Sequence, residues 1–249
     1  MIYRILGLVV ATACVVSSAA DEPYTWHASV EGGPVWQSRN DFRIPSATAT
    51  KVSLAENTSG PFRALRFHLG YRWGEQFRHE VRGLIAPLSL TSSITFSTPV
   101  DFQNQTFAAG TATEATYQFN SYRATYRYAF YHGETWNWSA GVTAKIRDAK
   151  VQLVQGAVAA EKKDVGVVPL LHVHGEWRFA ESWKMLLDMD ALAAPQGRAE
   201  DILLAVEWNP ISRWFFYTGY RMLEGGADNR DVFTSAWLHY AAFGARYTW

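Results

Sequence analysis

Cysteine is almost missing from this chain of 249 residues, because Cys14 is its only one. Cys14 lies inside an N-terminal segment that we expect to be removed, so the mature chain would contain no cysteine. This excludes disulfide bonds and thiolate chemistry from the mature protein. A lipoprotein anchored at Cys14 stays open as an alternative, although Ala11-Thr12-Ala13 lacks the leucine that is usual before such a cysteine.

An excess of charge and long apolar runs are also missing. Lys and Arg together number 23, and so do Asp and Glu, which gives a formal net charge of +0. This balance argues against a nucleic-acid partner, which would favour a basic face. After the N-terminal segment, no apolar run approaches the roughly 20 residues of a membrane-spanning helix, so a helical membrane protein is excluded. The mean hydropathy of -0.14 fits a membrane β-barrel, because lipid-facing and interior residues alternate along its strands.

The N-terminus has the pattern of a secretory signal peptide. Tyr3 and Arg4 precede an apolar run at 5–16, and small residues follow at 17–20. A positive start, a short apolar run and small residues at its end are typical of signal peptides. We therefore predict a signal peptide at 1–20, cleaved after Ala20, and a single barrel domain at 21–249. An uncleaved anchor is the alternative.

A period-2 alternation of apolar and polar residues recurs along the rest of the chain and predicts about ten β-strands. Their lengths are close to the 9–11 residues that a tilted strand needs to cross a bilayer. Short turns alternate with longer stretches at 38–60, 92–113, 153–164, 194–198 and 225–233, and this is the layout of outer-membrane barrels. An even number of strands would place both ends of the domain on the short-turn side. The predicted strands are 24–37, 61–73, 77–91, 114–131, 135–152, 165–180, 183–193, 199–208, 213–224 and 234–249.

The bulk of the side chains indicates which strand face points outward. One face of the segment 114–131 is aromatic, and the other carries small and polar residues with two arginines. A barrel of roughly eight to ten strands is only just wide enough inside for side chains, so several aromatic faces would overfill it, whereas lipid accepts them. We therefore predict a polar lumen. The outward residues of this segment would be Tyr122, Tyr126, Tyr128 and Phe130.

The positions of the tryptophans also indicate a membrane barrel. Of the 11 tryptophans, Trp36 and Trp237 lie toward the long-loop ends of the predicted strands, and the others lie beside short turns or a chain end. This distribution predicts an aromatic girdle at the periplasmic interface and a sparser one outside. The periplasmic girdle would contain Trp26, Trp73, Trp136, Trp138, Trp177, Trp183, Trp208, Trp214 and Trp249.

The last segment, from Ser235 to Trp249, alternates and ends on an aromatic residue. Its odd positions are mostly apolar and aromatic, and its even positions are smaller and include Arg246. A final strand that closes on a C-terminal aromatic resembles the tail of Gram-negative outer-membrane β-barrel proteins, in which it is the assembly signal. The resemblance is to this class and selects no single characterised family.

This resemblance implies an all-β fold, a single antiparallel transmembrane β-barrel of about ten strands with a polar lumen, located in the outer membrane after signal-peptide cleavage. It implies two partners, outer-membrane lipid and the barrel assembly machinery, which would recognise the strand that ends at Trp249. No cofactor and no nucleic-acid partner are expected. A partner of the extracellular loops is not indicated.

The predicted inward faces carry many charges, with more basic than acidic groups. Buried charges must be paired or hydrated. Arg–carboxylate pairs would plug the barrel, which is the interpretation we favour. The alternative is a water-filled, narrow pore that prefers anions. The candidate network residues are Arg66, His68, Arg82, Arg123, Arg127, Lys145, Arg147, His172, His174, Glu176, Asp188, Asp190, Glu207, Arg221 and Arg246, and Glu31, Arg72, Glu80, Arg178 and Lys184 are also expected to face inward.

Three local patterns invite more specific interpretations. His172, His174 and Glu176 share a strand face, as the ligands of a metal ion would. We favour histidines within the ion network instead and predict no metal site. The acidic, glycine-rich segment 223–231 lacks the spacing of a calcium loop and is interpreted as a surface loop. The segment 196–201 is interpreted as a polar turn.

Enzymatic activity is weighed against two kinds of barrel enzyme. The omptin proteases are ten-stranded barrels with acidic pairs and a histidine–aspartate pair at the outer rim. Asp188 and Asp190 would be such an acidic pair, but no histidine is expected to face inward at the outer rim, where acid–base catalysis would need one. Barrel lipid A deacylases use a histidine followed closely by a serine, which His239-Tyr240-Ala241 does not offer, and His239 is expected on the lipid face.

We therefore expect a non-enzymatic outer-membrane protein with a structural or surface-interaction role, with a narrow anion-preferring pore as a further option. A rim-active outer-membrane hydrolase, acting on protein or lipid, is the first alternative. A soluble periplasmic β-barrel is the second.

Overall fold

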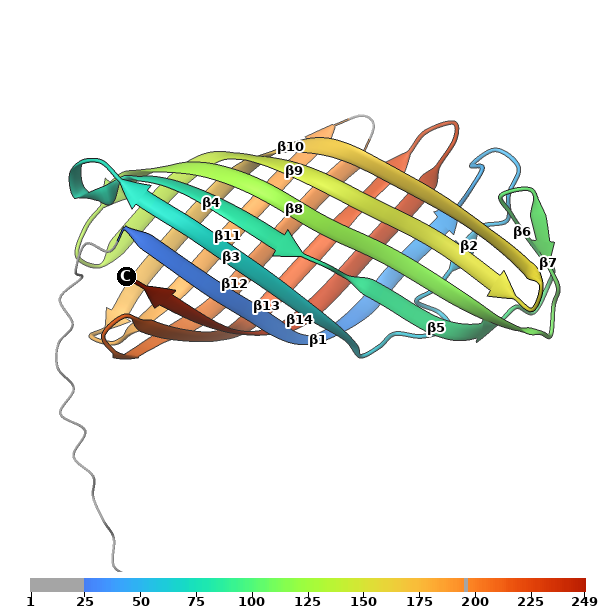
Figure 1. The fold of residues 1–249 in the computed structure, drawn as a ribbon, viewed down its shortest axis with the longest axis horizontal. Coiled ribbons are helices and arrows are strands. Elements are labelled where there is room, and N and C mark those ends of the chain that lie inside the picture. Colours follow the sequence, from blue (N-terminus) through green and yellow to red (C-terminus); the bar gives the residue numbers. More distant parts are fainter. Residues whose placement is uncertain (1–24, 195–196) are drawn as a thin grey trace, which may run out of the picture.

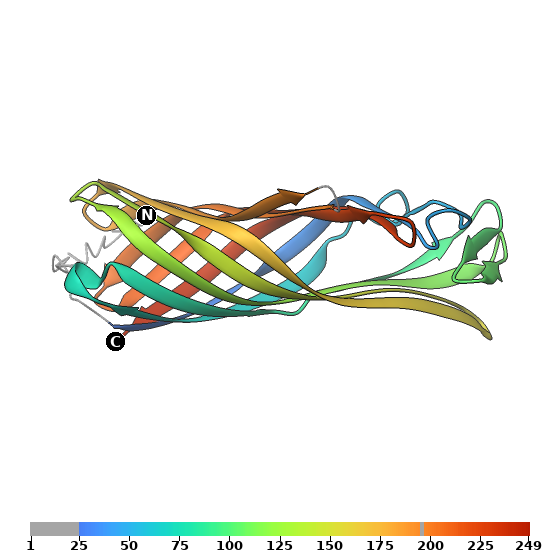
Figure 2. The ribbon, with the colours of Figure 1, turned by 90° about the horizontal axis from the view of Figure 1, so that it is seen from above.

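The computed structural model describes residues 25–194 and 197–249 as a long, closed β-barrel (Figures 1 and 2). The predicted signal peptide and its cleavage site lie outside the described residues. Strand β1 (Trp26–Arg43) pairs antiparallel with β14 (Phe233–Thr248), and this pairing closes the sheet. No helix in the described part is long and apolar enough to cross a membrane.

Ten antiparallel strands form the wall, each next to its neighbour in the chain. The third wall strand is interrupted, because β4 (His79–Ala86) and β5 (Ser89–Thr95) pair with successive parts of β8. The predicted all-β barrel of about ten strands is confirmed. The other wall strands are β3 (Phe62–Trp73), β8 (Ala112–His132), β9 (Trp136–Gln155), β10 (Val158–Ala180), β11 (Trp183–Ala194), β12 (Gly197–Ile211) and β13 (Trp214–Asp228).

The wall has an aromatic outer face and a polar inner face along most of its length. On β8, the side chains of Tyr122, Tyr126 and Phe130 are exposed, whereas Arg123 and Arg127 between them are buried inside. This alternation confirms the predicted orientation and the polar lumen. An exposed apolar belt of this kind is the surface that a transmembrane barrel presents to lipid.

β1 begins and β14 ends at the same end of the barrel (Figure 1), and aromatic side chains form a girdle there. The rings of Trp136 and Trp177 stack with centroids 5.4 Å apart, and Trp183 stacks on Trp208 at 5.8 Å. Trp26 and Trp249 exchange backbone hydrogen bonds of 3.2 and 3.0 Å, which close the barrel at this end. These positions agree with the predicted girdle at the short turns.

The connection predicted at 153–164 is wrong, because β9 and β10 continue through it. They are joined by the tight turn Gly156-Ala157, in which Gly156 has φ 59°. β10 pairs with β11 only from Leu171 onward, so its outward part rises beyond the neighbouring strands. We call this extension, formed by β5 and by residues 112–120, 147–155 and 158–170 of β8, β9 and β10, the arm (Figure 2). The sequence of 157–164 has four apolar residues followed by four charged residues, so it lacks the period-2 pattern that predicts a strand.

Two long connections at the arm end contain short strands of their own. β2 (Val52–Ser53) pairs with the end of β1, and β6 (Val100–Phe102) forms a hairpin with β7 (Gln105–Phe107). At the opposite end, a short 3-10 turn, η1 (Glu75–Phe77), joins β3 to β4. The surface loop predicted at 223–231 is wrong for 223–228, because these residues extend β13.

Candidate functional site: the interior of the barrel

Asp201 lies at the centre of the ion pairs in the middle of the barrel. Its carboxylate accepts hydrogen bonds from Arg66 at 2.9 Å, from Arg123 at 2.6 Å and from Arg221. These groups come from β3, β8, β12 and β13, and all of their side chains are buried. One carboxylate therefore connects four strands from different parts of the wall.

Glu31 of β1 is a second carboxylate in the same layer. Arg221 donates to its two oxygens at 2.7 and 2.9 Å, and the Tyr217 hydroxyl donates at 3.0 Å. Arg66 lies 3.6 Å from it, so the same two arginines contact both Glu31 and Asp201. Forked arginine–carboxylate contacts of this kind are among the stronger hydrogen bonds in proteins, and their geometry fixes both partners.

The two inward aspartates of β11 form the next layer. Arg82 donates to both oxygens of Asp188, at 2.9 and 3.1 Å, and Arg123 donates to Asp190 at 2.7 Å. His172 Nδ1 lies 2.8 Å from Asp190, and His174 Nδ1 lies 3.1 Å from Asp188. Both histidines are thus hydrogen-bonded within the ion network. Among the described residues, no cluster of three or more His, Cys, Asp or Glu side chains is arranged to hold a metal ion.

Near the aromatic girdle the lumen widens into a cavity of about 440 Å³. Glu80 accepts from Arg127 at 2.7 Å and from Arg72 at 2.8 Å, while Arg246 donates to Glu207 at 2.8 Å. Several buried polar atoms on its walls, such as Arg127 Nη1 and His27 Nδ1, have no hydrogen-bond partner among the residues that the structure describes. A space of this size holds on the order of ten water molecules. This end of the lumen is therefore a polar vestibule.

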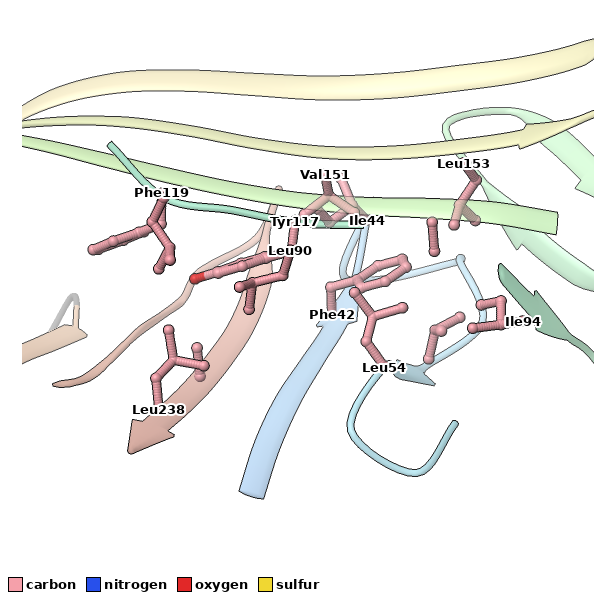
Figure 3. Packing of buried hydrophobic residues seen from close by; sticks show 14 of the residues in the cluster. Phe42, Ile44, Leu54, Leu90, Ile94, Tyr117, Phe119, Val151, Leu153 and Leu238 are labelled. Carbon is pink, nitrogen blue, oxygen red and sulfur yellow. The ribbon is translucent and has the colours of Figure 1, made fainter. Parts of the chain in front are cut away.

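The outer end of the interior is apolar, which the sequence analysis did not predict. Ile44 and Leu54, from the connection after β1, pack with Phe102 and Phe107 of the β6–β7 hairpin into one buried cluster. Inward side chains of the arm and of β14 belong to the same cluster, and Figure 3 shows several of them together with Phe42. The connections at 38–60 and 92–113 therefore fold inward and fill the outer mouth. We call this cluster the outer core; its other members include Leu90, Ile94, Tyr117, Phe119, Val151, Leu153 and Leu238.

The outer core lies directly on the ion network. A recess at their boundary, lined by Arg66, Phe119, Leu223 and Tyr240 among others, has a volume of only about 10 Å³. This is at the lower limit of the space that one water molecule needs. The side chains of the ion network and of the outer core are buried, so the described residues occupy the interior in two layers, one charged and one apolar, next to the polar vestibule.

Most of the predicted network residues lie together, and three lie apart. Lys145 Nζ is 4.6 Å from the centre of the Phe119 ring, at the base of the outer core. His68 contacts Ser29, with 3.3 Å between Nδ1 and Oγ. Arg147 pairs with Asp164 on the partly exposed arm, because β9 extends beyond the end of β11. The residues brought together by ion pairs or hydrogen bonds are Arg66, Arg82, Arg123, Arg127, His172, His174, Glu176, Asp188, Asp190, Glu207, Arg221 and Arg246.

Asp201 is the residue that the sequence analysis missed. The predicted strand 199–208 is confirmed, but the overlapping interpretation of 196–201 as a polar turn is wrong from Gly197 onward, because β12 begins there and pairs with both of its neighbours. The sequence contains an indication of its position. Asp201 and Glu207 are an even number of residues apart, so their side chains point to the same face of the strand, and Glu207 was predicted to face inward. The residues of β12 before Asp201 are mostly polar because they lie in the outer, more solvated part of the strand. A polar run of this kind is also typical of a turn.

Asp188 and Asp190 do not form an acidic pair at the outer rim. They lie below the outer core, and their oxygens bind arginines and histidines of the network. A hydrolase that uses these two carboxylates at the rim would need them above the outer core, where the structure does not place them.

No protein-family model matches this chain, and no curated protein matches it. Among solved structures, it resembles the outer membrane protease OmpT from Escherichia coli, with a TM-score of 0.55 and 9% identity over 94% of this chain and 100% of OmpT. The chain has the fold of a Gram-negative outer-membrane β-barrel. Weaker similarities are found to the transport unit of the autotransporter AIDA-I from Escherichia coli and to Ail, the attachment invasion locus protein of Yersinia pestis.

For the AIDA-I transport unit, the TM-score is 0.45, with 8% identity over 93% of this chain and 92% of that chain. For Ail, solved in complex with the heparin analogue sucrose octasulfate, the TM-score is 0.39, with 11% identity over 90% of this chain and 99% of that chain. Sequence identities this low support a similarity of fold only and support no inference about activity.

Proposed function

We propose that this chain is a non-conducting outer-membrane protein that acts at the cell surface through the arm and the outer core beneath it. The observation that carries the proposal is the filling of the interior by two successive layers, the ion network and the outer core. An open diffusion pore would need a continuous wet path from the vestibule to the outside, and a boundary recess of about 10 Å³ gives no support to one.

The arm has the properties of a rigid surface platform. Its inward face is fixed by apolar contacts, such as those of Tyr117 and Leu153 in the outer core. Its free edge along β10 carries Lys162 and Lys163, which disfavour unspecific pairing with other strands. A fixed polar surface of this kind suits recognition of a partner by side chains, as expected for a surface-interaction protein.

The assembly partners follow from the same fold. β14 pairs with β1 along almost its whole length and ends at Trp249, whose backbone closes the barrel with Trp26. We infer that the assembly machinery binds this last strand and that outer-membrane lipid covers the exposed apolar belt. Deletion of Trp249 should then lower the amount of folded protein in the outer membrane.

The orientation of the barrel is tested with two insertions of a short epitope. One follows Gly156 at the tip of the arm, where open space surrounds the residue, and its control follows Gly133 in the opposite turn. Insertions at exposed turns are usually tolerated. We expect antibody to bind the Gly156 epitope on intact cells, and the Gly133 epitope only after permeabilisation.

The same proteins, refolded in liposomes, are compared for uptake of small sugars and anions. We expect uptake equal to that of empty liposomes. Uptake well above that level by a folded barrel would contradict the proposal and favour a transport role. Labelling of the Gly133 epitope on intact cells would contradict the orientation.

A further inference from the structure

Closure of the barrel brings a serine and a histidine together on its outer surface. Ser38 of β1 and His239 of β14 are far apart in the sequence, but Ser38 Oγ lies 2.7 Å from His239 Nε2. The other ring nitrogen, Nδ1, lies 2.5 Å from the hydroxyl of Tyr220 on β13. When Tyr220 accepts a hydrogen bond from Nδ1–H, Nε2 is unprotonated and can accept the proton of Ser38. This is the arrangement of a nucleophile, a general base and a group that orients the base.

The site faces away from the lumen. His239 and Trp237 share the outward side of β14, while Leu238 between them and Tyr240 after them are buried inside. The pairing of β1 with β14 shifts register between Gln37 and Arg39, so Ser38 lies in a bulge of the wall and is exposed. β-bulges redirect side chains and are frequent next to active sites. The three strands β13, β14 and β1 are neighbours in the sheet, so the site spans a continuous patch of the wall (Figure 1).

The height of the site on the wall matches the outer interface of the membrane. Trp36 lies beside Ser38, and it is separated from Trp26 of the periplasmic girdle by about the 9–11 residues that a tilted strand needs to cross a bilayer. Trp237 stacks on His239 with ring centroids 5.7 Å apart. Tryptophans at this position lie at the level of lipid headgroups. The ester bonds of acyl lipids lie just below the headgroups, so they reach the level of Ser38.

We propose that Ser38, His239 and Tyr220 form a lipid-facing catalytic site that hydrolyses ester bonds of lipids in the outer leaflet. Ser38 Oγ attacks the ester carbonyl carbon, and its proton passes to His239 Nε2. His239 then protonates the leaving alcohol as the carbon–oxygen bond breaks, which leaves an acyl group on Ser38. Interfacial water, deprotonated by His239, releases the fatty acid and restores the serine. This inference goes beyond the proposed surface role; it rests on the orientation proposed above, and it does not depend on whether the interior is sealed.

Arg39 adds a positive charge to the same patch, and Glu224 offsets it only in part because Arg198 pairs with the same carboxylate. Its guanidinium carbon lies 5.5 Å from the centre of the Trp237 ring, and a guanidinium nitrogen lies 3.8 Å from Glu224. A fixed cation beside the nucleophile favours lipids with a phosphate group and the negative charge that develops on the ester oxygen. The expected substrates are therefore anionic or zwitterionic acyl lipids.

The test is covalent labelling of the refolded full-length protein with a fluorophosphonate, which reacts with serines activated by a base. Wild type should gain one label, mapped by peptide mass spectrometry to Ser38. Ser38→Ala and His239→Asn should lose it. Ser29→Ala is the matched control, because Ser29 contacts His68 on the lumen side, and this variant should label as wild type does. Heat-modifiable migration in gels shows that each variant is folded.

Hydrolysis is then measured with p-nitrophenyl dodecanoate in detergent micelles and with vesicles of phosphatidylethanolamine and phosphatidylglycerol. Because general base catalysis typically contributes about 10²–10⁴-fold, His239→Asn should lower kcat by at least about 10²-fold. Tyr220→Phe should lower kcat and leave KM unchanged, since it acts through His239. A folded wild type that gains no label at Ser38 and hydrolyses neither substrate above the Ser38→Ala level would overturn the proposal. Hydrolysis of the dodecanoate alone would exclude phospholipids as substrates and contradict the substrate class.

Discussion

The two layers of the interior differ in how they hold the same wall. β8 contributes to both, with Arg123 and Arg127 in the ion network and with Tyr117 and Phe119 in the outer core, all on its inward face. In the ion network, the wall strands contact one another directly through long charged side chains. In the outer core, inserted connections supply the apolar partners.

This difference has a physical origin. In the middle of the barrel no segment within 25–194 or 197–249 enters the lumen, and long arginines reach across it to carboxylates on other strands. A buried charge without its partner is strongly unfavourable, so each charged side chain of the ion network depends on the specific residues that pair with it. Apolar contacts are not directional and scale with buried area, so the outer core depends on the packing of Phe102, Phe107 and Ile44 rather than on any one pairing. The ion network should therefore fail when one residue changes, and the outer core should weaken gradually.

The largest effect is expected for Asp201→Ala. It removes the carboxylate shared by Arg66, Arg123 and Arg221 and leaves buried positive charges without compensation. Loss of one partner of a buried ion pair typically costs about 3–5 kcal/mol, and we expect the upper part of this range in urea unfolding of the refolded barrel. Asp148→Ala is the control, because Asp148 accepts hydrogen bonds only from amides of the arm in this structure, and its loss should cost about 1 kcal/mol or less. Equal effects of the two changes would refute the central role of Asp201.

A smaller effect is expected for Leu153→Ala in the outer core. Leu153 is fully buried between the arm and the inserted connections. Removing a buried leucine side chain costs about 2–4 kcal/mol, within the usual range. Loss of the Leu153 side chain should weaken the packing of the connections at 38–60 and 92–113 while the ion network stays intact. Faster proteolysis within these two connections would report this change. Val167→Ala, at a position 74% exposed on β10, is the control and should leave proteolysis unchanged.

The smallest effect is expected for Arg147→Ala. Arg147 pairs with Asp164 on the arm, and both side chains are partly exposed. Ion pairs with this exposure contribute about 0–1 kcal/mol because water and salt screen them. A double-mutant cycle with Asp164→Ala should give a coupling energy below about 1 kcal/mol, decreasing in high salt. A coupling energy as large as the stability lost in Asp201→Ala would contradict this expectation and would mean that ion pairs stabilise the arm.

Much of the fold followed from alternation, because a side chain on a strand can face only two ways. The wall strands were predicted on that basis. The outward tyrosines of β8 were predicted from the bulk of the aromatic face, and the girdle was predicted from the tryptophans beside the short turns. The inward packing of residues 44–54 and of the β6–β7 hairpin was not predicted. Connections have no periodic pattern from which one could predict whether their apolar residues pack inside the barrel. Asp201 was missed because its local neighbours are polar. The contact of Ser38 with His239 depends on closure between the first and last strands, which no local pattern records.

The most direct test of a sealed interior is the conductance of the refolded protein in a planar lipid bilayer, recorded with anion and cation gradients. Folding is verified in the same sample by heat-modifiable migration. A sealed interior predicts no steady single-channel steps from the wild-type barrel. Steady steps with a preference for anions that weakens when Arg123 or Arg127 is neutralised would contradict it and would indicate an open, basic lumen.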